Sequence, residues 1–303
     1  MAVLSDAPDT LNGVTGPTAL RYDIVDVFTD TPFEGNPLAV VHGADGLPDG
    51  VLHALAREFN LSETAFALPA TQDGADYRVR IFTPTTELPF AGHPSVGTAW
   101  VLARDGVIAK GDIVQECGAG RLPISVDESG AELTGGPPVL GAVCDAEPLA
   151  AAVGLNPEDV DARGAPGRVG CGIDFTVLAV RPDAVARAVP DPVALRALDL
   201  GAGLMIVAVD GPDVHARVFA PGLGVTEDPA TGSAALALGV WLVNRRVLPP
   251  IGGSGYYVSQ GAEIGRPSVL DCHVDAMDSA AVRVTVRGGV VPIARGEIAV
   301  PGQ

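Results

Sequence analysis

A repeated motif constrains this chain more than any other feature of its sequence. Glu87-Leu-Pro-Phe-Ala-Gly92 recurs 140 residues later as Glu227-Asp-Pro-Ala-Thr-Gly232. Upstream, Arg80-Ile-Phe-Thr-Pro84 recurs 137 residues later as Arg217-Val-Phe-Ala-Pro221. Each copy reads as a strand, a proline turn, a Glu-x-Pro-x-x-Gly motif and a strongly apolar helix. The simplest fold for such a chain contains two copies of one strand-rich unit, each packed around a central helix.

Strands outnumber helices in the rest of the pattern. Apolar runs predict strands over residues 22–27, 38–41, 77–82, 204–209, 214–219 and 282–286, and helical periodicity predicts helices over 49–59, 94–103 and 234–243. We therefore expect an α+β protein with a flexible extension over residues 1–19, an N-terminal lobe over 20–136 and a C-terminal lobe over 137–303. The lobes meet at Gly135-Gly-Pro-Pro138, which suits neither regular structure. Whether the last strand crosses back to the N-terminal lobe is left open.

The charge balance excludes several classes of partner. The chain has 19 Lys and Arg residues against 37 Asp and Glu residues, and its formal net charge of -18 repels phosphate groups. We therefore expect neither nucleic acid nor a membrane surface as a partner. A run of about eighteen apolar residues, which a membrane span needs, does not occur, and the N-terminus lacks the pattern of a secretory signal. A cytoplasmic location is the resulting expectation.

Cofactor and metal chemistry is also restricted. Lys110 is the only lysine, and it lies in a turn-like stretch, so a Schiff base to pyridoxal phosphate or to a carbonyl substrate is disfavoured. We predict no metal site, because metal-ligand spacing is missing among the cysteines and among His42, His53, His215 and His273. We interpret the cysteines as buried free thiols: Cys117, Cys144, Cys171 and Cys272. We interpret four histidines as surface residues: His42, His53, His215 and His273.

The repeat also indicates where a ligand binds. In each copy a glycine, Gly92 or Gly232, ends the turn where the apolar helix begins. A helix N-terminus directs unpaired N–H groups and a positive dipole end at its surroundings. Pro94 suits the first helical position, which makes His93 the expected N-cap, and Ser233 is its counterpart. If the lobes face each other, both helix starts converge on one cleft that binds a carboxylate.

Two carboxylates are candidate acid–base groups. Glu63 lies among apolar neighbours in Leu61-Ser-Glu-Thr-Ala-Phe66, where burial would raise its pKa and suit it to proton transfer. Asp228 precedes Pro229, and the repeat predicts that His93 of the first copy faces it. Each residue also has an ordinary explanation: an exposed strand end for Glu63, helix capping for His93 and Ser233, and turn formation for Asp228.

An ordered set of motifs runs from about residue 20 to the C-terminus. Its members are Tyr22-Asp-Ile-Val-Asp-Val-Phe28, Gly35-Asn-Pro-Leu-Ala-Val-Val41, Leu61-Ser-Glu-Thr-Ala-Phe66, Phe90-Ala-Gly-His-Pro94, Glu227-Asp-Pro-Ala-Thr-Gly-Ser-Ala234 and Ser259-Gln-Gly-Ala-Glu-Ile-Gly-Arg-Pro-Ser268. In these motifs the chain resembles the PhzF-like (phenazine biosynthesis F) isomerases. The resemblance implies the diaminopimelate-epimerase fold, in which two similar lobes each wrap a sheet around a central helix and the active site lies between them.

The resemblance further implies isomerisation without cofactor or metal, and commonly a homodimer. It implies that Glu63 is the proton-shuttling acid and base, and that His93 and Asp228 are the polar pair that orients the substrate. The groups expected around the substrate carboxylate are Ser233, Gly92, Gly232 and Thr231. In the phenazine enzymes the substrate is trans-2,3-dihydro-3-hydroxyanthranilate, so we expect a small unsaturated cyclic carboxylic acid from secondary metabolism.

Three alternatives stay open. The first is a double-bond isomerase that acts on another precursor, such as an unsaturated proline derivative. The second is an amino-acid racemase or epimerase of the same fold. Its two cysteines would fall near Ala91 and Thr231, neither of which forms a thiolate, so two-thiol chemistry is disfavoured. The third is a non-catalytic binding protein on this scaffold.

Overall fold

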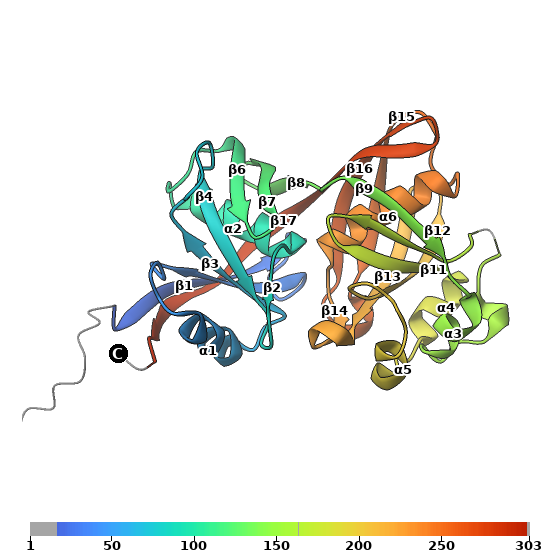
Figure 1. The fold of residues 1–303 in the computed structure, drawn as a ribbon, viewed down its shortest axis with the longest axis horizontal. Coiled ribbons are helices and arrows are strands. Elements are labelled where there is room, and N and C mark those ends of the chain that lie inside the picture. Colours follow the sequence, from blue (N-terminus) through green and yellow to red (C-terminus); the bar gives the residue numbers. More distant parts are fainter. Residues whose placement is uncertain (1–16, 163, 302–303) are drawn as a thin grey trace, which may run out of the picture.

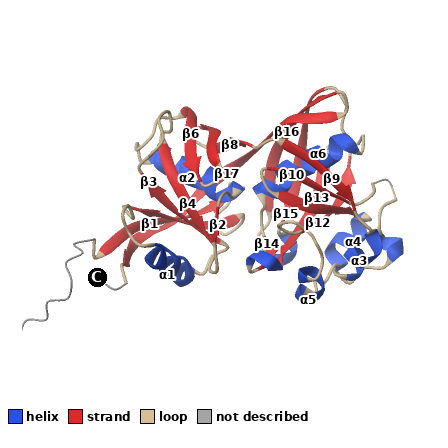
Figure 2. Cartoon of the chain, in the orientation of Figure 1, coloured by secondary structure: helices blue, strands red, loops and turns tan. Residues whose placement is uncertain are grey.

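The computed structural model describes residues 17–162 and 164–301, so most of the extension expected over residues 1–19 lies outside the described residues. Two lobes lie side by side, each with its strands arranged around one central helix (Figure 1). Strands dominate both lobes (Figure 2). The predicted α+β fold, with two similar lobes wrapped around central helices, is confirmed.

The N-terminal lobe is a sheet that curves around α2 (Gly92–Arg104). Its strands are β1 (Ala19–Val27), β2 (Asn36–His42), β3 (Glu63–Leu68), β4 (Tyr77–Phe82), β5 (Glu87–Leu88), β6 (Gly111–Cys117), β7 (Gly120–Val126) and β8 (Gly130–Thr134). Neighbours follow the order β1-β2-β3-β4-β6-β7-β8, and the pairs β2–β3 and β4–β6 are parallel. Helix α1 (Asp49–Phe59) has the predicted bounds and packs its apolar side, with Leu52 and Leu55, against the outer face of the sheet.

The C-terminal lobe repeats this arrangement around α6 (Gly232–Asn244). Its strands are β9 (Pro138–Val143), β10 (Gly167–Cys171), β11 (Asp174–Ala179), β12 (Leu204–Asp210), β13 (Asp213–Ala220), β14 (Val225–Asp228), β15 (Gly252–Gln260) and β16 (Ser268–Met277). Neighbours follow the order β9-β10-β11-β12-β13-β15-β16, and the parallel pairs β11–β12 and β13–β15 match those of the first lobe. Short helices lie outside the sheet or between strands: α3 (Ala146–Ala151), α4 (Pro182–Arg187), α5 (Pro192–Arg196) and the 3-10 turns Pro157–Asp159, Pro221–Leu223 and Ala262–Ile264.

Strand β17 (Ala280–Ala299) belongs to both lobes. Its first half pairs with β16, from Ala280 opposite Met277 to Arg287 opposite Asp271. Its second half pairs with β1, from Val290 opposite Val27 to Ala299 opposite Ala19. Residues 285–289, which overlap the end of the first half, also pair with β8, so the sheet of the N-terminal lobe closes into a ring. Residues 290–299 thus lie in the N-terminal lobe, and this is the crossing that the sequence left open.

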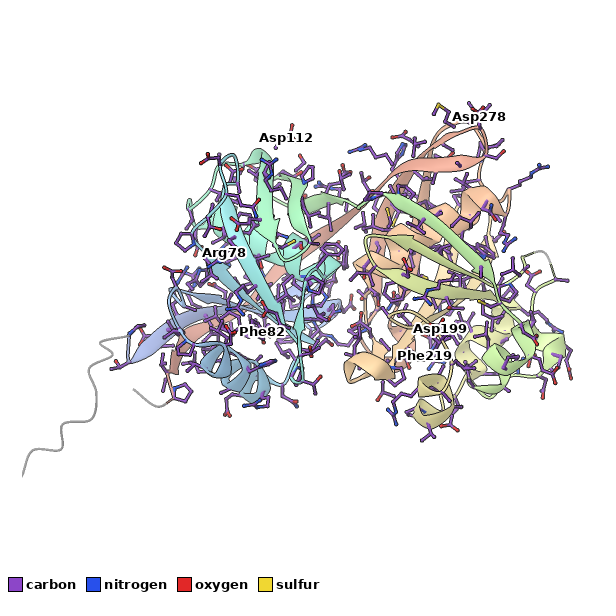
Figure 3. All side chains as sticks on the ribbon, in the orientation of Figure 1. Arg78, Phe82, Asp112, Asp199, Phe219 and Asp278 are labelled. Atoms are coloured by element: carbon purple, nitrogen blue, oxygen red, sulfur yellow. The ribbon has the colours of Figure 1, made fainter. Side chains whose placement is uncertain are left out.

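The repeat seen in the sequence is also a repeat of contacts. Arg80 donates two hydrogen bonds to Glu87, at 2.8 and 2.7 Å, and Arg217 donates two to Glu227, both at 2.8 Å. In each lobe the guanidinium lies over the ring of a phenylalanine two residues later, Phe82 or Phe219. Figure 3 labels these two phenylalanines, one in each lobe. One arginine–glutamate pair therefore ties the strand to the Glu-x-Pro motif in both copies, and it fixes the turn that leads into the central helix.

The central helices are buried on every side. In α2 all residues from Gly92 to Ala103 are buried, and in α6 all residues from Gly232 to Val243 are buried. A helix that is apolar all round belongs in a core rather than on a surface, which explains why both sequences lack a polar face. Among the described residues no helix has the length and apolar character needed to cross a bilayer.

Candidate active site

The two central helices begin at one point between the lobes. Helix α2 starts at Gly92 and α6 at Gly232. The two glycines pack so closely that a Cβ added to Gly92 would lie 2.9 Å from Gly232 Cα and from Ser233 N. Neither N-cap residue, Ala91 or Thr231, makes a side-chain capping bond, and neither helix has an acidic residue in its first turn. The positive ends of the two helix dipoles therefore meet, and neither the N-cap residues nor the first turns supply a negative charge to neutralise them.

The expectation that His93 caps its helix is wrong. The N-cap is Ala91, and His93 and Pro94 are the second and third helical residues. Proline is tolerated there because the first four N–H groups of a helix have no internal acceptor, so Pro94 does not mark the first position. His93 is consequently held by the rigid first turn, and its ring points toward Glu63 of the neighbouring strand.

A narrow cavity of about 40 Å³ lies at this junction. Its polar lining consists of Glu63, Asp228, Thr231 and Ser233. Both lobes supply its apolar walls, which are formed by Leu88, Phe90, Ala91, Ile173, Phe175, Ala202, Val218, Ala220, Leu223 and Val225. Four of the predicted residues, Glu63, Asp228, Thr231 and Ser233, thus line one cavity, whereas His93 lies behind Glu63 and is not part of the lining. Gly92 and Gly232 contact each other beside it instead.

Glu63 is the first residue of β3, and 13% of its side chain is exposed. Its Oε2 lies 3.5 Å from His93 Nε2. Both atoms are buried, and neither has a hydrogen-bond partner within the described ranges. Burial raises the pKa of Glu63 well above its usual value, and the nearby Asp228 carboxylate raises it further. Both effects favour the protonated form of the Glu63 carboxyl and make its carboxylate a stronger base than an exposed one.

His93 and Asp228 differ from Glu63 in charge and in partners. Burial lowers the pKa of His93 to about 3, so its imidazole is neutral. Burial raises the pKa of Asp228 to about 6, although hydrogen bonds from Thr231, Asn36 and Ser62 favour the charged form. The Thr231 Oγ1 donates to Asp228 Oδ2 at 2.5 Å. Asp228 is thus held in one orientation by its hydrogen bonds. Glu63 Oε2, in contrast, has no hydrogen-bond partner among the described residues.

Two buried amides at the site received no role from the sequence. Asn36, the first residue of β2, bonds to Asp228 Oδ1 at 2.9 Å and contacts His93 Nδ1 at 3.2 Å. Gln260, the last residue of β15, donates to the Asp228 carbonyl at 2.7 Å and to Thr231 Oγ1 at 3.0 Å. Both lie within motifs that carried the resemblance. A signal existed in each: an amide residue at the end of a strand, next to a glycine.

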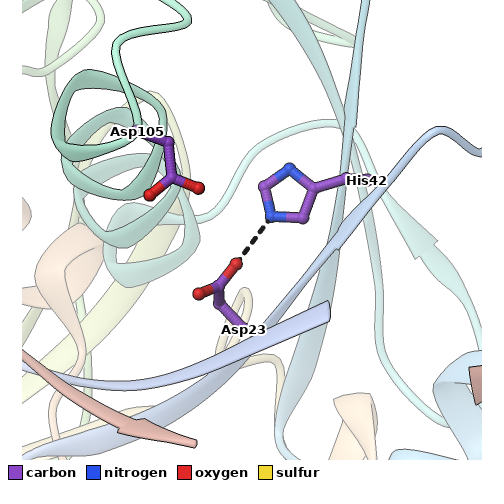
Figure 4. A group of neighbouring side chains, drawn as sticks. All are labelled: Asp23, His42 and Asp105. Atoms are coloured by element: carbon purple, nitrogen blue, oxygen red, sulfur yellow. Dashed lines mark hydrogen bonds and ion pairs between the residues drawn. The ribbon is translucent and has the colours of Figure 1, made fainter. Parts of the chain in front are cut away.

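A second cluster of chemical groups lies in the N-terminal lobe, away from the cavity. His42 Nε2 bonds to Asp23 Oδ2 at 2.9 Å, and Asp105 lies beside them (Figure 4). Their ligand atoms lie within 4.8 Å of one another, but the two carboxylates already pair with three arginines: Arg21, Arg104 and Arg295. Three guanidinium groups neutralise the site, so it is an ion-pair network rather than a metal site. The surface position expected for His42 is wrong.

The cysteines take no part in the cavity. All four lie in the described ranges and are free thiols; Cys144 is half-buried and the others are buried. Burial raises the pKa of Cys171 to about 12, so that group is a thiol at neutral pH. The N-cap positions where a two-thiol racemase would need cysteines hold Ala91 and Thr231.

Comparison with known proteins connects this geometry to a family. The family model described as phenazine biosynthesis-like protein matches residues 25–296. The chain belongs to this PhzC–PhzF family. A trans-2,3-dihydro-3-hydroxyanthranilate isomerase of Pseudomonas aeruginosa is 35% identical over 287 residues, which cover 91% of this chain and 98% of the relative. An uncharacterized isomerase of Escherichia coli K12, YddE, is 32% identical over 294 residues, covering 91% and 97%.

Solved structures agree with the family assignment. A predicted epimerase from Pseudomonas aeruginosa is 34% identical, with a TM-score of 0.79 over 92% of this chain and 99% of that one. A probable proline racemase from Agrobacterium radiobacter, 13% identical, gives a TM-score of 0.66 over 93% of both chains and shows the shared fold alone. The named relatives of this PhzF-family chain support the expectation of an isomerase.

Proposed function

We propose that this PhzF-family protein is a cofactor-independent isomerase that moves a proton, and with it a double bond, in an unsaturated cyclic amino or carboxylic acid. Relatives named as trans-2,3-dihydro-3-hydroxyanthranilate isomerases match about nine-tenths of the chain and favour a substrate of that type. The observation that carries the proposal is the position of Glu63. It is a largely buried carboxyl with a raised pKa that lines a mainly apolar cavity. It lies 3.5 Å from His93 Nε2, which has no hydrogen-bond partner among the described residues.

Glu63 performs the proton transfer in this proposal. Its carboxylate removes a proton from an sp3 ring carbon, and the electron pair of the broken C–H bond shifts into the conjugated system. The protonated Glu63 then returns the proton to another carbon of that system, so the product is an isomer and the enzyme is unchanged. One carboxyl serves as base and then as acid, because its raised pKa makes the carboxylate a stronger base and lets the protonated form hold the proton until it is returned.

The other groups hold the substrate while the proton moves. The N-termini of α2 and α6 are the donors for the substrate carboxylate, together with the Ser233 hydroxyl. Asp228 accepts a hydrogen bond from an amine or hydroxyl of the substrate, since its own donors fix its orientation. The apolar walls exclude water from the carbanion-like species formed between the two proton transfers.

Proton NMR in deuterated water tests the proposal. Incubation with trans-2,3-dihydro-3-hydroxyanthranilate is expected to show double-bond migration and deuterium at one specific carbon. The Glu63→Gln variant should fold normally and lose on the order of a hundredfold or more in rate. Glu58→Gln, on the exposed side of α1, is the matched control and should keep full activity. Normal turnover by the Glu63→Gln variant would remove Glu63 from its role.

The same experiment separates the alternatives. Turnover of an unsaturated proline-type acid, with none of the anthranilate precursor, would support double-bond isomerisation in another pathway. Deuterium incorporation at a stereocentre without double-bond migration would indicate a racemase or epimerase. Tight binding without any proton exchange would indicate a binding protein. The homodimer implied by the family resemblance stays a prediction, which light scattering on the purified protein checks.

A further inference from the structure

Asn36 links the two lobes at the proposed proton-transfer site. It is fully buried at the start of β2, in the N-terminal lobe. Its amide nitrogen donates to Asp228 Oδ1 and to the carbonyl of Ala230, each at 2.9 Å, and both acceptors belong to the C-terminal lobe. The same nitrogen contacts His93 Nδ1 at 3.2 Å. Asn36 therefore touches both members of the polar pair expected to orient the substrate.

The orientation of the Asn36 amide follows from its acceptors. A carboxylate oxygen and a carbonyl oxygen carry no hydrogen, so both require a donor opposite them. If the amide were turned around, its oxygen would face two other oxygens in a buried site. The –NH₂ group must therefore point toward Asp228 and Ala230, and it consequently also faces His93 Nδ1.

This orientation determines which nitrogen of His93 carries the proton. The two hydrogens of the Asn36 amide are directed at Asp228 Oδ1 and the Ala230 carbonyl, and the amide nitrogen has no lone pair that accepts a hydrogen bond. A proton on His93 Nδ1 would therefore face a positively polarised group, so this nitrogen presents its lone pair instead. The ring is neutral, and its single proton therefore resides on Nε2. That Nε2–H is buried, lies 3.5 Å from Glu63 Oε2, and has no hydrogen-bond partner among the described residues. It is a spare donor beside the proposed base.

We propose that Asn36 is a positioning residue that fixes His93 in the Nε2–H tautomer and thereby makes His93 a hydrogen-bond donor, not a second base, next to Glu63. The effect on catalysis rests on the proposed function; the tautomer itself does not. In this assignment the histidine stabilises negative charge that develops on the substrate, and Glu63 alone moves the proton. A reversed tautomer would put a lone pair against the Glu63 carboxylate and remove the donor.

The test is the tautomer of His93 in the full-length protein, measured by two-bond ¹⁵N–¹H correlation NMR on protein with ¹⁵N-labelled histidine. The His93 signals are those lost in a His93→Gln variant. The wild-type protein at neutral pH is expected to show the Nε2–H form. Asn36→Leu removes the donor with little change of volume, and the ratio of Nδ1–H to Nε2–H should rise by about tenfold or more. Asn36→Ala is the second variant, should the leucine fail to fold.

Arg266→Met is the matched control. Arg266 also joins the lobes close to Asn36, because it donates to the Gly35 carbonyl at 2.9 Å and pairs with Asp26, but it does not contact His93 in the described hydrogen bonds. This variant should keep the wild-type tautomer. If a substrate turns over, Asn36→Leu should lower kcat more than it changes KM.

Two results would overturn the proposal: a wild-type His93 that is protonated on Nδ1, or Asn36 variants that keep the Nε2–H form as fully as Arg266→Met does. An Nε2–H wild type that turns over no candidate acid would instead refute the proposed function and leave the role of Asn36 intact.

Discussion

Replacing Gly92 with alanine is expected to push the two helix starts apart and to slow the reaction by about ten- to a hundredfold. The new Cβ would lie 2.9 Å from Gly232 Cα and from Ser233 N, which are backbone atoms that cannot rotate away. Ordinary contact begins at 3.4 Å. Because the surrounding core is close-packed, the two helix starts must separate by roughly 0.5 Å.

That displacement stretches the bonds that cross between the lobes. The bond from Asn36 to Asp228 is 2.9 Å long, and a shift of roughly 0.5 Å takes it beyond the usual range for N–H···O bonds. A hydrogen bond to a charged group contributes about 1.5–3 kcal/mol. Its loss, expressed in the transition state, corresponds to the expected fall of about ten- to a hundredfold in kcat/KM.

The assay combines turnover by NMR with urea unfolding of the same preparations. Gly50→Ala is the control, because Gly50 is exposed in α1 and an added Cβ would meet no atom within 4 Å. That variant should keep full activity and gain up to about 1 kcal/mol of stability, since alanine favours the helix. A Gly92→Ala protein with wild-type kcat/KM and wild-type stability would refute the reasoning.

Three further predictions concern charge. Glu227→Ala breaks a buried ion pair and should lower the free energy of unfolding by about 3–5 kcal/mol. Glu87→Ala breaks the more exposed counterpart of this pair and should lower the same free energy by about 1 kcal/mol or less. Equal losses for the two variants in urea unfolding would contradict this prediction. The folded-state pKa of Asp228, about 6, exceeds its ordinary value of 3.8, so the stability it contributes is present below pH 3.8 and lost as pH rises through 6. The free energy of unfolding of Asp228→Asn, relative to that of the wild type, should therefore rise by on the order of 3 kcal/mol between pH 4 and pH 7. A difference between the two proteins that does not change with pH would contradict this prediction. The same substitution removes a negative charge that raises the pKa of Glu63. The titration of the Glu63 carboxyl, followed by ¹³C NMR, should therefore move to lower pH. A titration that stays in place or moves to higher pH would contradict the proposed interaction between the two carboxyls.

Local sequence signals predicted the elements well where the forces are local. Helix α1 has the predicted bounds because its apolar side and its end at Asn60, a left-handed residue with φ 50°, are both encoded in neighbouring residues. The helices α2 and α6 begin two residues earlier than predicted, at Gly92 and Gly232, because a helix start does not exclude glycine and Pro94 fits the third position as well as the first.

What the sequence could not provide are the contacts between distant segments. Glu63, Asp228 and Ser233 were identifiable as candidates from their motifs, and the structure brings them to one cavity. The role of Asn36 depends on an acceptor 192 residues away in the other lobe, and no local pattern reports such a pair. The crossing of β17 could be raised from the sequence but not decided, because a strand's sequence does not say which edge it joins.

The shared strand β17 has a consequence for the order in which the molecule is made. During synthesis the segments that form β1–β8 leave the ribosome first, yet the edge of β1 stays unpaired until residues 290–299 have emerged. The first lobe to be translated is thus the last to close, and its open edge is exposed to neighbouring nascent chains throughout. A short deletion at the C-terminus would therefore damage the lobe that carries Glu63.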